Sequence, residues 1–123
     1  MAHTFEGYRR PDGRVGVRNY VAVIPTSVAA SSVASAIADE AGPWARATPH
    51  QLGTSQPTPA RRQTERVLVG IGRNPNVGAA LVVELGTEDI SAETIADGIS
   101  NSGKTTETLA IREVGGTSNA LVE

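Results

Sequence analysis

GYRRPDGRVGVRNYVAVIPT, residues 7–26, combines a tight turn, a cluster of four arginines and the pattern of a buried strand. Residues 11–13 (Pro-Asp-Gly) favour a tight turn, because proline presets φ and glycine accepts a positive φ. Residues 20–25 form a nearly continuous apolar run, as expected for a strand covered on both faces. Thr26 and Ser27 then start a helix. The stretch therefore predicts an N-terminal turn or hairpin that leads into the first strand of a sheet.

Downstream, the apolar pattern alternates between helical and extended spacing. Gly42 ends the first helix, and Ser91 is a good N-cap for the third. In chain order the pattern predicts strands at 20–25, 46–49, 77–85 and 106–114, and helices that begin at Ser27, Thr58 and Ser91. This order predicts a parallel sheet with helices on both faces. We therefore expect residues 1–123 to be a single α/β domain, three-layered and Rossmann-like, with a mainly parallel sheet of about four strands.

Composition excludes several classes of protein. A chain of 123 residues suits one domain. A net charge of −2 gives no field that attracts nucleic acid or acidic membranes. No apolar run approaches the roughly 20 residues of a membrane span, and no leader precedes the first turn, so a cytoplasmic location is expected. The absence of cysteine excludes disulfides and thiolate metal sites.

Residues 98–105, GISNSGKT, match the G-x-x-x-x-G-K-[ST] phosphate-loop pattern. The functional motif needs a strand before it and a helix after it. Here a capped helix precedes the motif and a strand follows it. The inverted order favours a glycine helix stop over nucleotide binding.

Polar residues gather where the predicted strands end. Ligands of such sheets bind outside the carboxyl ends of the strands. Glycine permits close backbone approach there, and helix N-termini offer amide donors to an anion. This edge suits a small polyoxygenated acid; the alternative is that its residues only cap helices and form turns. The residues expected there are Thr26, Ser27, His50, Gly53, Thr54, Gln56, Gly86, Thr87, Glu88, Gly115, Gly116 and Thr117.

Four collinear stretches carry a family resemblance: residues 7–26, 74–78 (NPNVG), 81–88 (LVVELGTE) and 111–117 (IREVGGT). Together they resemble the altronate/galactarate dehydratase (UxaA-type) family of sugar-acid hydro-lyases. The resemblance covers about residues 5–117 and only part of the family's catalytic region. It implies that a base removes the proton alpha to a carboxylate, and that a metal or acid then assists loss of the beta-hydroxyl. The substrate would be an aldonate or aldarate.

The resemblance also suggests roles for particular residues. His50 is expected as a metal ligand or as an acid or base, because an imidazole side chain can do either near neutral pH. Glu88 is expected as an oxygen ligand or a base. Arg14 and Arg18 can hold the substrate carboxylate, or they are solvated arginines on a surface hairpin. The residues expected to hold substrate hydroxyls are Thr26, Gln56 and Thr87.

Three positions that are commonly cysteine in these dehydratases are Ala29, Thr54 and Thr87 here. Threonine and alanine offer no thiolate, so no thiolate-bound cluster is expected. A divalent cation (iron, magnesium or manganese) held by His50 and Glu88 remains the expected cofactor. The alternative is a non-catalytic binding or assembly module, or an inactive fragment. We expect a homo-oligomer, or dependence on a partner subunit or a C-terminal region, because the fourth strand would be left partly uncovered.

Overall fold

The computed structural model describes residues 6–50, 58–84 and 90–111. These ranges contain three helices and six strands. In chain order they are β1 (Tyr8–Arg9), β2 (Val15–Gly16), β3 (Tyr20–Pro25), α1 (Val28–Ala41), β4 (Ala45–Ala47), α2 (Thr58–Arg73), β5 (Val77–Glu84), α3 (Ala92–Ser100) and β6 (Thr105–Ala110). None of these helices is long and apolar enough to cross a membrane.

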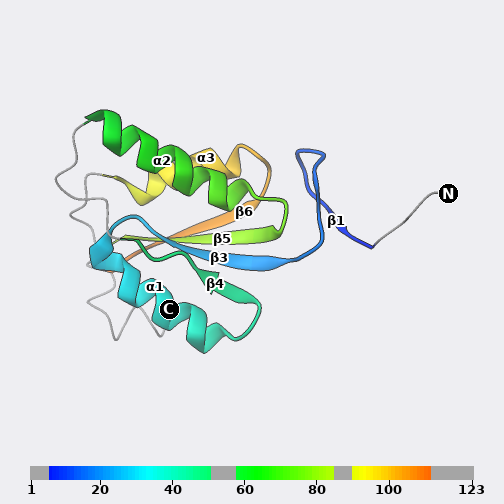
Figure 1. Cartoon of the computed structure of the whole chain (residues 1–123), viewed down its shortest axis with the longest axis horizontal. Helices are drawn as coiled ribbons and strands as arrows, with labels where there is room; N and C mark the ends of the chain where they lie inside the picture. Colours follow the sequence, from blue (N-terminus) through cyan, green and yellow to red (C-terminus); the bar gives the residue numbers. More distant parts are fainter. Residues whose placement is uncertain (1–5, 51–57, 85–89, 112–123) are drawn as a thin grey trace.

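The central sheet has the strand order β4-β3-β5-β6, and every neighbouring pair is parallel. Helix α1 packs on one face, and α2 and α3 pack on the other (Figure 1). The predicted three-layer α/β fold with a four-stranded parallel sheet is confirmed.

The core explains why β3 is apolar along nearly its whole length. Ala22 and Ile24 belong to the core under α2 and α3, whereas Val23 belongs to the core under α1. Successive side chains of a strand point to opposite faces, so a strand between two helical layers must be apolar on both.

Helix boundaries follow the capping residues. Ser27 is the N-cap of α1, and Gly42 ends that helix with φ at 102°. The Ser91 hydroxyl accepts hydrogen bonds from the backbone N–H groups of Glu93 and Thr94 at the start of α3. All three ends agree with the sequence-based prediction. Gly42 and Ser91 act through local capping chemistry, whereas Ser27 occupies the N-cap position without a side-chain capping hydrogen bond.

Three boundaries differ from the prediction. Strand β4 spans 45–47 and not 46–49, and β6 ends at Ala110 while 106–114 was expected. Helix α2 includes Thr58 itself and continues through both of its glycines to Arg73. Gly72 is needed there for packing, because a methyl group on its Cα would lie 2.2 Å from the Ile99 Cδ1 atom of α3.

The N-terminal hairpin, formed by the antiparallel strands β1 and β2, docks on the loop between α2 and β5. Arg10 is buried at this contact. Its guanidinium donates to the carbonyl oxygens of Pro75 (2.6 Å) and Arg18 (2.7 Å) and to the Asn19 side chain (3.0 Å). A methyl group at Gly16 would lie 1.9 Å from the Pro75 carbonyl oxygen, so only glycine fits. The expected turn or hairpin is therefore a docked element at the amino ends of β3 and β5.

Lys104, the lysine of the phosphate-loop pattern, is buried between α3 and β6. Its Nζ donates to the carbonyl oxygens of Gly72 (2.9 Å) and Asn74 (2.5 Å). Helix α3 precedes the lysine and strand β6 follows it, which is the inverted order predicted from the sequence. Gly103, with φ at 90°, ends the turn between α3 and β6. The motif therefore serves as a helix stop whose lysine binds main-chain carbonyls.

Candidate functional site

His50 lies beyond the end of β4, and its ring reaches over to the end of β3. The ring nitrogen Nε2 is 2.8 Å from the carbonyl oxygen of Pro25, the last residue of β3. A carbonyl oxygen only accepts hydrogen bonds, so Nε2 must carry the proton in this contact. If this imidazole acts as a base or as a metal ligand, it must do so through Nδ1.

Ser31, at the end of the first turn of α1, holds the main chain of His50. The His50 N–H donates to Ser31 Oγ at 3.1 Å, and the same Oγ lies 3.0 Å from the His50 carbonyl oxygen. Ser31 Oγ also lies 3.1 Å from the carbonyl oxygen of Ser27. Ser31 cannot be recognised as a partner of His50 from the sequence alone, because a serine at this spacing also fits an ordinary helix.

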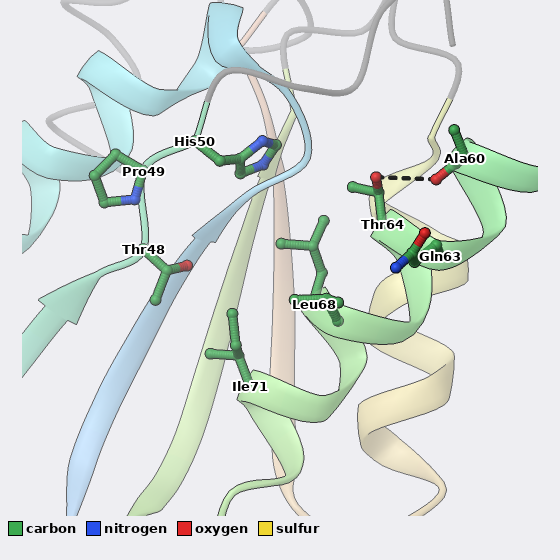
Figure 2. A pocket seen from close by; sticks show the side chains of 9 residues that line it. Thr48, Pro49, His50, Ala60, Gln63, Thr64, Leu68 and Ile71 are labelled. Atoms are coloured by element: carbon green, nitrogen blue, oxygen red, sulfur yellow. Dashed lines mark hydrogen bonds between the residues drawn. The ribbon is translucent and has the colours of Figure 1, made fainter. Parts of the chain in front are cut away.

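A cavity of about 400 Å³ lies beside His50, between the end of β4 and α2 (Figure 2). On the α2 side the wall is mainly aliphatic, and Figure 2 shows Leu68 and Ile71 facing Thr48 and His50. Within the part of the chain that the structure describes, Thr48 Oγ1 is buried without a hydrogen-bond partner. The cavity thus has a carbon-rich wall opposite a hydroxyl and an imidazole. It is lined by Thr48, Pro49, His50, Ala60, Gln63, Thr64, Val67, Leu68 and Ile71.

The structure places Thr26 and His50 at the same edge of the sheet, as expected. Thr26 directly follows β3, and its backbone N–H donates to the Val83 carbonyl oxygen at 3.0 Å. Its side chain is fully buried, so Thr26 packs beneath this edge of the sheet and is not part of its exposed surface. Four predicted site residues lie outside the described residues, as does the predicted turn at 115–117. The roles of Thr54, Gln56, Thr87 and Glu88 therefore stay predictions.

Arg14 and Arg18 lie at the opposite end of the sheet. Arg14 binds Asp12 at 3.0 Å and the carbonyl oxygen of Arg73, and Arg18 precedes the amino end of β3. A strand rises about 3.3 Å per residue, so the two ends of β3 are about 20 Å apart. The structure therefore does not group these arginines with His50. Within one chain, a small sugar acid beside His50 cannot also touch them.

Glu84, the last residue of β5, caps the start of α3. Its Oε2 accepts a hydrogen bond from the Ala92 N–H at 2.9 Å. A carboxylate is stabilised at a helix N-terminus by the unpaired N–H groups and the helix dipole. This contact was not predicted from the sequence, although a glutamate at the end of a buried strand, shortly before a capped helix, is a signal for it.

A divalent cation at His50 and Glu88 would need further ligands close by. In the described ranges, no three histidine, cysteine, aspartate or glutamate residues gather into a group that could hold a metal ion. His50 is the one predicted ligand inside those ranges, and its Nε2 already contacts Pro25. The cation at His50 and Glu88 stays a prediction.

Comparison with known proteins gives one family. The family model described as D-galactarate dehydratase/Altronate hydrolase, second domain, matches residues 7–123. The (2R)-sulfolactate sulfo-lyase subunit beta of Chromohalobacter salexigens is 38% identical over 112 residues, which are 91% of this chain and 28% of that protein. The altronate dehydratase of Bacillus subtilis is 34% identical over 95 residues, 70% of this chain and 19% of that protein. This chain thus matches less than a third of the length of either relative. No solved structure matches it.

Proposed function

Because the chain belongs to the D-galactarate dehydratase/altronate hydrolase family, we propose that it forms part of the catalytic region of a lyase that removes water from an aldonate or aldarate. The observation that carries this proposal is the fixed position of His50. Its ring lies at the carboxyl edge of a parallel sheet, where such folds bind ligands, and beside a cavity of about 400 Å³.

The proposed reaction begins with His50 Nδ1 as the base. It takes the proton from the carbon alpha to the substrate carboxylate, and the C–H electron pair forms a carbon–carbon double bond as the beta C–O bond breaks. The leaving hydroxide takes up a proton, either returned by the His50 imidazolium or given by a protonated Glu88 carboxyl, and departs as water. The resulting enol tautomerises to a 2-keto-3-deoxy acid. Glu88 is proposed to assist the leaving group, alone or through a divalent cation that would neutralise the developing negative charge.

The cavity supports the same assignment. In this proposal the aliphatic wall of α2 contacts the carbon skeleton of the acid, and the polar groups of the acid face His50. Figure 2 shows Leu68 and Ile71 on that wall, opposite His50. Both relatives are lyases by name, but they act on different acids. The reaction class is therefore better supported than the substrate.

A second candidate is a non-catalytic binding or assembly module of the same family. The residues Ala29, Thr54 and Thr87 favour it, since they supply no thiolate where these dehydratases commonly have cysteine. Activity and association together separate the two candidates. A module associates with other chains but does not turn over a sugar acid.

The test measures 2-keto-3-deoxy acid formation from galactarate and altronate, with iron, magnesium or manganese added, alongside light scattering. His50→Gln is expected to lower kcat at least about 100-fold, because removal of a general base typically costs that much. His3→Gln is the matched control and should leave kcat unchanged. A His50→Gln variant as active as the wild type would contradict the proposal. A chain that associates with other chains but produces no keto acid under any of these conditions would favour the second candidate, because the resemblance already predicts little activity for this chain alone.

A further inference from the structure

Ser31 makes more contacts with His50 than an ordinary helical serine needs. A serine in a helix often donates to the carbonyl four residues earlier, and the 3.1 Å contact with Ser27 is of that kind. The two contacts with His50 are different, because they join residues 19 positions apart. They tie α1 to the segment that leaves β4.

The hydroxyl of Ser31 can both accept and donate. It accepts from the His50 N–H at 3.1 Å, and its single hydrogen points to the carbonyl oxygen of Ser27 or of His50. Ser31 is buried, with 9% of its surface exposed, so water does not readily replace these bonds. The backbone of His50 is therefore held from one side of the sheet by α1.

The ring of His50 is held separately by the last residue of β3. Nε2 contacts the Pro25 carbonyl oxygen at 2.8 Å, and β3 is the central strand that α1 also packs against. Main chain and ring thus have anchors on two neighbouring elements. If the main-chain anchor is lost, the ring can leave Pro25, and the imidazole can change its position at the sheet edge.

We propose that Ser31 is a positioning residue that fixes the His50 imidazole at the carboxyl edge of the sheet. This inference deepens the proposed function and assumes the proposed role of His50 as the base. The described contacts of the Ser31 hydroxyl are with the main chain of Ser27 and His50, so its proposed role runs through His50. It acts on the reaction only by keeping the His50 ring on the Pro25 carbonyl, with Nδ1 in a constant direction.

The experiment compares Ser31→Ala with Ser32→Ala in a His3→Gln background, which leaves His50 as the single histidine. Ser32 is the matched control, because it is the next residue of α1 and is exposed. NMR reports the hydrogen exchange of the His50 amide and the chemical shifts of its ring. Thermal unfolding is recorded in parallel, so that a general loss of stability is recognised.

Ser31→Ala is expected to speed exchange of the His50 amide about tenfold and to move the ring signals, whereas Ser32→Ala does neither. Unchanged ring signals in Ser31→Ala overturn the proposal, even if the amide exchanges faster or the protein melts earlier. These readouts need no turnover, so they stand if the chain proves inactive. With an active protein, Ser31→Ala should lower kcat about tenfold with little change in KM. Turnover that survives in His50→Gln would contradict the role of His50 and leave the NMR result on Ser31 intact.

Discussion

The Nζ atom of Lys104, at the end of the α3–β6 turn, donates a hydrogen bond to the carbonyl oxygen of Gly72 near the end of α2. The last carbonyls of a helix have no partner within the helix, and a cation is favourable beside them. Arg14 donates to the next carbonyl, that of Arg73, and Arg10 donates to Pro75. With the bond from Lys104 to Asn74, four successive carbonyls, 72–75, receive cationic donors from two distant segments. The α2–β5 loop is thus the joint between the hairpin and the sheet.

Measured above about pH 10, where the folded lysine is neutral, Lys104→Met is expected to lower the free energy of unfolding by about 1–3 kcal/mol, because it leaves the carbonyls of Gly72 and Asn74 without this donor. Urea unfolding measures the change. The same variant should leave nucleotide binding unchanged and negligible in calorimetry, since the lysine is buried and occupied by main-chain acceptors. Binding of a nucleoside triphosphate that disappears in the variant would restore the phosphate-loop interpretation.

The same lysine makes stability depend on pH. Burial, with a smaller contribution from the Arg10 charge, lowers the pKa of Lys104 to about 8, from 10.5 for an unburied lysine. Between these two values the unfolded chain holds a proton that the folded chain has released. The free energy of unfolding should therefore rise as pH increases from about 8 towards 10.5. The neutral amine keeps N–H donors for both carbonyls, so the bonds persist. Urea unfolding as a function of pH should show this rise in the wild type and not in Lys104→Met. If the free energy of unfolding depends on pH in the same way in both proteins, Lys104 is not the cause of the rise.

Gly72 and Gly70, two residues apart in α2, form a matched pair for the packing of α2 on α3. A methyl group at Gly72 would lie 2.2 Å from Ile99 Cδ1, whereas one at Gly70 would have no atom within 4 Å. Gly72→Ala is expected to destabilise the protein by about 1–3 kcal/mol through overpacking. Gly70→Ala should stabilise it by about 0.5–1 kcal/mol, because alanine is the better helix former. Equal shifts of the melting temperature in the two variants would contradict the close packing of Gly72 against Ile99.

The sequence predicted the layers of the fold because they depend on local signals. The apolar run of β3 and the caps at Ser27, Gly42 and Ser91 each act within a few residues, and the structure confirms them. The continuation of α2 through Gly72 could not be predicted in this way. Its cause is the contact with Ile99, which lies 27 positions away and exists only in the folded protein.

The candidate site was predicted in part for the same reason. Strand order places Thr26 and His50 at one edge, so their common location follows from the predicted topology. The function of the arginine-rich stretch does not follow from topology. Arg10 and Arg14 bind carbonyls of the α2–β5 loop, and residue type alone does not separate a main-chain partner from a substrate carboxylate. The contact of Ser31 with His50 likewise depends on how α1 packs on the sheet.

Arg10 is the central contact of the hairpin, and its neighbour Arg9 provides the control. The Arg10 guanidinium makes three hydrogen bonds, to Pro75, Arg18 and Asn19, and it lies over the Tyr8 ring at 5.2 Å. Lysine keeps the charge but cannot reproduce a planar fork that reaches three acceptors. Arg10→Lys is therefore expected to lower the free energy of unfolding by about 1.5–3 kcal/mol, while Arg9→Lys at its exposed position changes it by less than about 0.5 kcal/mol. Urea unfolding gives both values. Limited proteolysis within residues 7–18 should increase in Arg10→Lys and not in Arg9→Lys, because only Arg10→Lys weakens the binding of the hairpin to the α2–β5 loop. Equal stability and equal cleavage in the two variants would mean that the hairpin is held by other contacts.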